Sequence, residues 1–156
     1  MKKFLYMCMM LLAATLTFTA CGSDDDDNPN DPKNPQQEGE VIRDDYYKYQ
    51  ESVEIKGYGS LIVIGEATFE KGVCNAMAFS YVFSSKQLAN AVWKSFQDDE
   101  SMADDLKYYS YDGDKTIVYR MKEDVVRQSA ALGKEYVCGI VRSTVKTMIS
   151  AFTYDE

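Results

Sequence analysis

The chain has 156 residues, with 17 lysines and arginines against 25 aspartates and glutamates, no histidine, and a formal net charge of −8. Its basic residues are scattered among acids, which argues against nucleic-acid binding, because a phosphate backbone is held by clustered Lys and Arg. The absence of histidine from the sequence excludes Ser-His-Asp and Cys-His catalysis and most zinc sites. The sequence contains no phosphate-binding loop or dinucleotide fingerprint, so no cofactor is expected.

Residues 1–20 have the features of an export signal. Lys2 and Lys3 precede an uncharged apolar run from Phe4 to Ala14, and the small residue Ala20 closes the segment. The apolar run is about half of the roughly 20 residues that cross a bilayer, so a permanent transmembrane helix is not expected. We therefore predict a signal peptide that is removed.

The tetrapeptide Phe18-Thr19-Ala20-Cys21 resembles the lipobox of bacterial lipoproteins, although Phe18 replaces the usual aliphatic residue. In that family the cysteine is diacylated and becomes the new N-terminus, which implies lipidation of Cys21 and a membrane anchor there. A plain secreted protein is the alternative. The following run Gly22-Ser23-Asp24-Asp25-Asp26-Asp27 resembles the acidic tag of some Gram-negative surface lipoproteins. The resemblance implies an outer-membrane lipoprotein at the cell surface, with a periplasm-facing one as the alternative.

Residues 21–40 are predicted to form a disordered tether. The segment from Asn28 to Glu40 holds three prolines, polar residues and charge, and no apolar side chain that could join a core. The remaining residues, 41–156, suit one domain of ordinary size.

A first hairpin is predicted from strands over Leu61–Phe69 and Val73–Phe83. With the three-residue loop Glu70-Lys71-Gly72, Phe69 faces Val73 and Cys74 points away from the core. The core face then holds Leu61, Val63, Ala67, Phe69, Val73, Met77, Phe79, Tyr81 and Phe83.

A helix is predicted to follow, running to Asp99. Ser84 stands at the N-cap position, with Gln87 three residues later completing a capping box. Leu88, Ala89, Val92, Trp93 and Phe96 recur at helical spacing, so Trp93 is expected to be a core anchor.

A second hairpin is predicted from Leu106 to Met121 around the two-residue turn Asp112-Gly113. That turn places Tyr109 and Tyr111 on the face away from the core. The opposite, core face holds Leu106, Tyr108, Ile117, Tyr119 and Met121.

One long helix is predicted from Glu123, kinked at Gly133 or Gly139, although the β-branched residues of 134–150 also suit a strand. The resulting ββαββα order favours an α+β fold, with an antiparallel sheet and helices packed on one face. Cys74 and Cys138 are then expected to be free thiols, because the thickness of the sheet opposes a disulfide between them. An oxidising compartment favours the disulfide alternative.

Tyrosine is the unusual feature of the composition. Tyr46, Tyr47, Tyr109 and Tyr111 are the candidate binding residues, because exposed rings with hydroxyl groups are typical of recognition surfaces. We therefore expect a non-catalytic binding or interaction module with a glycan or protein ligand, or a homodimer covering the same rings. An inhibitor or immunity-type protein acting on a basic partner is the alternative, and an enzyme of unrecognised class is the third.

Overall fold

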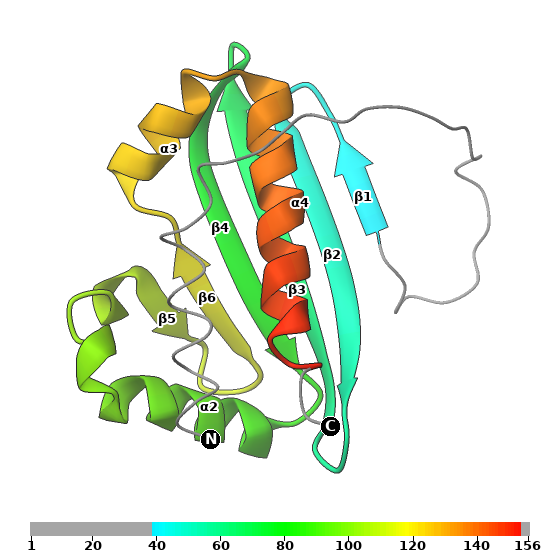
Figure 1. The fold of residues 1–156 in the computed structure, drawn as a ribbon, viewed down its shortest axis with the longest axis vertical. Helices are drawn as coiled ribbons and strands as arrows, with labels where there is room; N and C mark the ends of the chain where they lie inside the picture. Colours follow the sequence, from blue (N-terminus) through cyan, green and yellow to red (C-terminus); the bar gives the residue numbers. More distant parts are fainter. Residues whose placement is uncertain (1–38, 154–156) are drawn as a thin grey trace. The chain divides into compact units, whose positions relative to one another are not determined.

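The computed structural model describes residues 39–153 (Figure 1). The predicted signal peptide, Cys21 and the tether before Gly39 lie outside the described residues. Within them, six strands form one antiparallel sheet in the order β1-β2-β3-β4-β6-β5. The strands are β1 Gly39–Ile42, β2 Tyr46–Ile55, β3 Gly59–Glu70, β4 Val73–Phe83, β5 Tyr109–Tyr111 and β6 Thr116–Arg120. The helices are α2 Lys86–Asp98, η1 Glu100–Met102, η2 Leu106–Tyr108, α3 Glu123–Ala130 and α4 Lys134–Ser150, of which η1 and η2 are 3₁₀.

The fold class is α+β, as predicted, but the element order is not ββαββα. Two strands, β1 and β2, precede the first predicted hairpin, and β1 includes Gly39 and Glu40 from the predicted tether. The final helix is divided into α3 and α4 at Gly133, whose φ of +94° is one that L side chains rarely adopt. Residues 134–150 are helical, so the strand alternative is wrong.

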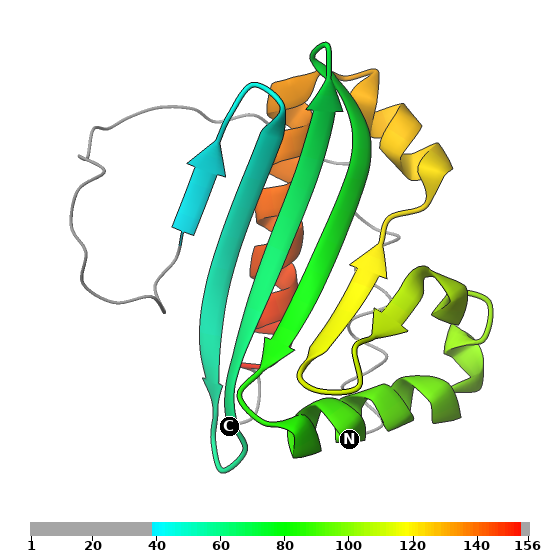
Figure 2. The same ribbon diagram turned by 180° about the vertical axis from the view of Figure 1, so that it is seen from behind.

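The helices cover one face of the sheet. Figure 1 shows α4 lying along the middle strands with α3 beside it, and α2 crossing the end of the sheet. Figure 2, from behind, shows no helix of the described residues over the opposite face of β2, β3 and β4. Gly65 allows α4 to approach closely, because a Cβ at Gly65 would lie 2.6 Å from Val141 Cγ1 and 2.8 Å from Val145 Cγ2. The largest fully buried side chains are Tyr47, Leu61, Val63, Phe79, Phe83, Ile117, Val137, Val141 and Val145.

The β3–β4 hairpin confirms the predicted core face but not the predicted loop. Lys71 and Gly72 form a two-residue turn, with φ of +51° and +80°. An irregularity then leaves Asn75 as an extra residue, because Phe69 pairs with Cys74 and Thr68 with Ala76. Because of this bulge, the β4 side chains from Met77 to Phe83 lie on the faces that were predicted for them. Between the turn and the bulge, however, two side chains are exchanged relative to the prediction, since Val73 is 57% exposed and Cys74 is 5% exposed.

The N-cap of α2 is Ser85, one residue later than predicted. Its side chain accepts a hydrogen bond from the Leu88 backbone N–H at 3.2 Å. Ser84 instead accepts a bond from the Ser60 N–H at 2.9 Å, which ties the start of β3 to the end of β4. The predicted apolar side of the helix is confirmed, with Trp93 packed against the core.

Candidate functional site

Tyr109 and Tyr111 do not lie on the face away from the helices, so that prediction is wrong. Tyr109 pairs with Tyr119 across β5 and β6, and Tyr119 pairs with the buried Phe79 of β4, so all three share the face that α4 covers. The two tyrosines pack against α2, with centroid distances of 5.3 Å from Tyr109 to Phe96 and 5.8 Å from Tyr111 to Trp93. Both rings therefore contribute to the packing of α2 against the sheet.

The side chain of Asp112 is the reason for this reversal. Asp112 Oδ1 accepts hydrogen bonds from the backbone N–H of Asp114 at 2.7 Å and of Thr116 at 3.0 Å. The Asp112 N–H also donates to the Thr116 carbonyl at 3.1 Å, so the turn has three residues and not two. The bonds from Thr116 and Asp114 hold the pKa of Asp112 below its usual value. The longer turn exchanges the two faces of β5, and Leu106 and Tyr108 fall in η2.

Tyr46 and Tyr47 are neighbours in β2 and therefore point to opposite faces of the sheet. Tyr47 is 0% exposed on the side of α4, and its hydroxyl donates to Glu40 Oε1 at 2.5 Å. The Tyr46 hydroxyl donates to the Glu66 carboxylate on the other face. Burial and Glu66 together raise the pKa of Tyr46 to about 12. Tyr46 is thus the only one of the four candidate tyrosines that faces away from the helices.

The sheet face that points away from α4, here called the open face, has an apolar centre. Ile62 pairs with Val82 across β3 and β4, and Ile64 lies two residues along on the same face. Ser80, opposite Ile64, pairs on its other side with Val118 of β6. The four apolar side chains are half-buried by their neighbours in the sheet. They form a contiguous apolar area across three strands.

Charged and hydroxyl side chains border this centre at one end of the face. Lys48 pairs with Glu66, which accepts the Tyr46 hydroxyl bond. Arg120 reaches Ser110 of β5, with its Nη1 donating to Oγ at 3.2 Å. An apolar centre with a polar border is the usual anatomy of a protein interface.

A second cluster joins β1 to α4. The Tyr47 hydroxyl and Arg142 both donate to the same oxygen, Oε1 of Glu40. Partial burial acts to raise the pKa of Glu40, but the bonds from Tyr47 and Arg142 outweigh it, so the pKa lies below its usual value. Lys134 Nζ donates to the carbonyls of Arg43 and Asp44 in the loop that follows β1.

Two open hollows lie beside the helices, one at α4 and one at α3. One, of about 480 Å³, adjoins the Glu40 cluster and is lined by Ile42, Tyr47, Lys134, Glu135, Cys138, Gly139 and Arg142. The other, of about 540 Å³, lies between β4 and α3 and is lined by Val73, Cys74, Asn75, Glu123, Val126, Arg127, Ala130 and Ala131. Neither lining contains a set of side chains arranged for a known catalytic reaction.

The carboxylates and thiols of residues 39–153 are dispersed over the domain. Within that range no three His, Cys, Asp or Glu side chains are grouped to hold a metal ion. Cys74 and Cys138 are both free thiols, as predicted, but Cys74 is on the core side and not on the opposite one. Burial raises the pKa of both thiols, which keeps them protonated and poor as nucleophiles.

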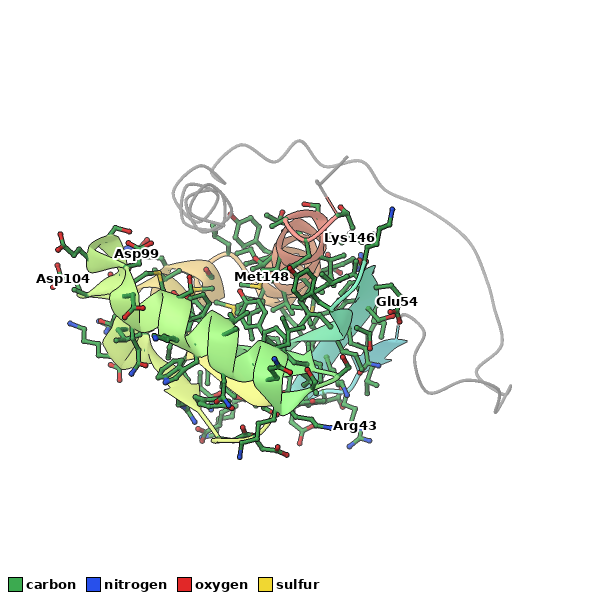
Figure 3. The ribbon with its side chains drawn as sticks, turned by 90° about the horizontal axis from the view of Figure 1, so that it is seen from below. Arg43, Glu54, Asp99, Asp104, Lys146 and Met148 are labelled. Carbon is green, nitrogen blue, oxygen red and sulfur yellow. The ribbon has the colours of Figure 1, made fainter. Side chains whose placement is uncertain are left out.

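The described domain also carries an acidic corner after α2. Figure 3 shows Asp99 and Asp104 on the opposite side of the domain from Lys146 of α4. Part of this charge is engaged locally, since Asp99 accepts bonds from Ser101 and Asp105 pairs with Lys122 at 2.6 Å. The acids of the corner are Asp98, Asp99, Glu100, Asp104 and Asp105.

Comparison with protein-family models, with curated proteins and with solved structures gave no match. Among the described helices, none has the length and apolar character needed to cross a membrane.

Proposed function

We propose that this protein is a non-catalytic binding module that recognises a partner protein through the open face of its sheet. The observation that carries the proposal is the apolar centre of Ile62, Ile64, Val82 and Val118, over which no helix of the described residues lies. Contiguous apolar surface with a polar border is seldom left without a use on a soluble domain.

A protein partner suits this face better than a glycan. The open face presents β-branched side chains and one tyrosine, and the hydroxyl of that tyrosine is bonded to Glu66. Both hollows described above lie elsewhere, beside α3 and α4. Small ligands are held in concave sites with converging polar groups, whereas protein interfaces are broad with an apolar centre.

We also propose that the module is carried on the cell envelope by lipid at Cys21, at the surface of an outer membrane. The lipobox-like tetrapeptide and the acidic run after it support this location. Surface display places the open face where a protein from outside the cell or a neighbouring envelope protein can reach it.

The experiment compares two substitutions that each replace an apolar side chain with aspartate. Ile64→Asp places a charge in the apolar centre, and Leu132→Asp changes a residue that is 61% exposed in the loop between α3 and α4. The chain from Gly22 to Glu156 is used to capture proteins from envelope extracts, and the captured proteins are identified. A candidate partner is then purified and titrated against the wild-type chain and each variant. We expect Leu132→Asp to leave the affinity unchanged and Ile64→Asp to weaken it by about tenfold or more, or about 1.4 kcal/mol.

Two results would contradict the proposal. Equal binding of the partner to both variants would place the interface elsewhere on the chain. Saturable binding on a glycan array that survives Ile64→Asp would identify a carbohydrate site away from the open face. Circular dichroism of each variant checks that a loss of binding is not caused by a loss of folding.

The acidic corner supports a second function, inhibition of a basic partner. Five acids between residues 98 and 105 concentrate charge on one side of the domain. Charge complementarity of this kind raises the association rate and makes it sensitive to salt. Replacing Asp98, Asp99 and Glu100 with the corresponding amides should then slow association at low salt, while Ile64→Asp should not.

A further inference from the structure

The register of the strands arranges the side chains of the open face in rows. Residues that pair across neighbouring strands share a row, and the next row lies two residues along each strand. One middle row contains Gln50, Ile64, Ser80 and Val118. The other middle row contains Ser52, Ile62, Val82 and Thr116. The apolar centre of the open face is therefore divided between two adjacent rows.

Charges of opposite sign lie on β2 at the two ends of this face. Lys48 is one row beyond the middle rows at one end, and Arg120 shares its row. Glu66 is in that row too, but its carboxylate accepts the Tyr46 hydroxyl, and the two basic side chains leave this end positive. Glu54 is exposed one row beyond the middle rows at the other end. The face is therefore complementary in charge to a copy of itself turned end for end.

A two-fold axis that runs across the strands, between the two middle rows, brings these complementary groups together. Each strand then lies on the same strand of the other copy in the opposite direction, which stacked sheets allow within about 30° of alignment. Lys48 of each copy lies opposite Glu54 of the other. In the centre, Ile64 lies opposite Ile62. The side chain of Val82 meets the small Ser80, so that a large group faces a gap.

The other face-to-face arrangement, with the two-fold axis parallel to the strands, is less favourable. It places β2 on β6, so that Lys48 of one copy meets Arg120 of the other in a like-charge contact. It also places the two β1 strands at opposite edges of the dimer. The axis across the strands keeps both β1 strands at one edge, where Gly39 shares the row of Gln50. Both chains then lead to the proposed lipid anchors from the same edge.

We infer that the partner on the open face is a second copy of this chain, in a symmetric dimer with Ile62 and Ile64 at its centre. The inference rests on the proposed function and names the occupant of that surface. A uniformly acidic or basic partner would match one end of the face, whereas a second copy matches both ends. The homodimer expected from the sequence was to cover Tyr109 and Tyr111, and the open face is a different surface.

The first test exchanges the two charges separately and then mixes the variants. Sedimentation equilibrium of the chain from Gly22 to Glu156 measures the dissociation constant, which we expect in about the micromolar range. Lys48→Glu and Glu54→Lys should each weaken the dimer by about tenfold or more, because both charged contacts become repulsive. An equimolar mixture of these two variants should form a heterodimer about as tight as the wild-type dimer, since each contact again joins opposite charges.

A matched control and a cross-linking experiment support this measurement. Lys94→Glu makes the same charge change at an exposed position of α2 and should leave dimerisation unchanged. Lys48 and Glu54 lie about 20 Å apart along β2, so a zero-length carbodiimide cross-link between them has to join two chains. A mixture of isotope-labelled and unlabelled wild-type chains should give this cross-link with mixed labels. The cross-link decides the question if a charge variant fails to fold.

Four results would overturn the inference: a wild-type chain that stays monomeric up to about millimolar concentration, a dimer that survives Ile64→Asp, charge variants that associate no better mixed than alone, or the absence of the mixed-label cross-link. The fate of the proposed function is read separately. If the chain is monomeric but captures an envelope protein that Ile64→Asp releases, the open face is still an interface and only its occupant is wrong. If neither association depends on Ile64, both proposals fail.

Discussion

The ring of Tyr109 lies on the ring of Tyr119, with the two centroids 4.7 Å apart, on the sheet face that the helices cover. Phe96 of α2 closes over the other side of Tyr109 at 5.3 Å. This arrangement connects β5, β6 and α2, and it gives the second hairpin its place in the core.

Replacing Tyr109 with Ser is therefore expected to destabilise the domain by about 2–4 kcal/mol, because an aromatic side chain is lost from a packed cluster. Tyr108→Ser should cost less, since Tyr108 lies in η2 with Lys107 and Lys122 over its ring. Urea unfolding monitored by the fluorescence of Trp93, the only tryptophan, measures both. If Tyr108→Ser proves the more damaging, the three-residue turn at Asp112 is wrong.

The close approach of α4 to the sheet predicts opposite effects for two glycine substitutions. Gly65→Ala should destabilise the domain by about 1–3 kcal/mol, because the new methyl group would clash with Val141 and Val145. Gly139→Ala should stabilise it by about 0.5–1 kcal/mol, since Gly139 lies within α4 with open space around it. Thermal unfolding of the two variants provides the comparison. Destabilisation by Gly139→Ala of the same size as by Gly65→Ala would contradict the packing described.

Glu40 should make the attachment of β1 depend on pH. Because its pKa is lower in the folded chain than the ordinary value of 4.5, the ionised form stabilises the fold above that value. This stabilisation is lost as pH falls below 4.5 and through the folded pKa. The difference in unfolding free energy between wild type and Glu40→Gln should thus be largest near pH 7 and shrink in acid. A difference that grows on acidification would show that the carboxylate is not held by Tyr47 and Arg142.

The proposed lipidation of Cys21 predicts the distribution of the protein between membrane and soluble fractions. Cys21→Ser should move it to the soluble fraction, because the variant lacks the residue that would carry the proposed lipid anchor. Cell fractionation followed by mass measurement of the mature N-terminus tests this. Tight membrane association of the unlipidated variant would count against the lipoprotein assignment.

The sequence predicted the α+β class, the core face of the first hairpin and the packing side of α2, because apolar spacing reports which side chains are buried. The strand from Tyr46 to Ile55 was missed, although Tyr47, Tyr49, Val53 and Ile55 recur at even spacing between polar residues. Charged residues within that run concealed the alternation. β1 is harder to predict, since its four residues carry little pattern.

The candidate site was predicted less well, for a physical reason. The face on which a hairpin residue lies depends on loop length, and one residue more or fewer moves every side chain to the other face. The carboxylate of Asp112 accepts bonds from two backbone N–H groups and lengthens the second turn, which places Tyr109 and Tyr111 on the face that the helices cover. Tyr46 was placed among binding residues, and it is the one that reaches the open face. Arg142 was missed because its partner Glu40 is distant in sequence and lay within the predicted tether.

The turn and the bulge of the β3–β4 hairpin together have a consequence for the chemistry of Cys74. With the predicted three-residue turn, Cys74 would point to the open face, where oxidants and other thiols could reach it. In the structure Cys74 pairs with Phe69, so its sulfur lies in the core and its pKa is raised by burial, and little reactive thiolate forms at neutral pH. If the chain is exported as proposed, this position protects the thiol in an oxidising compartment.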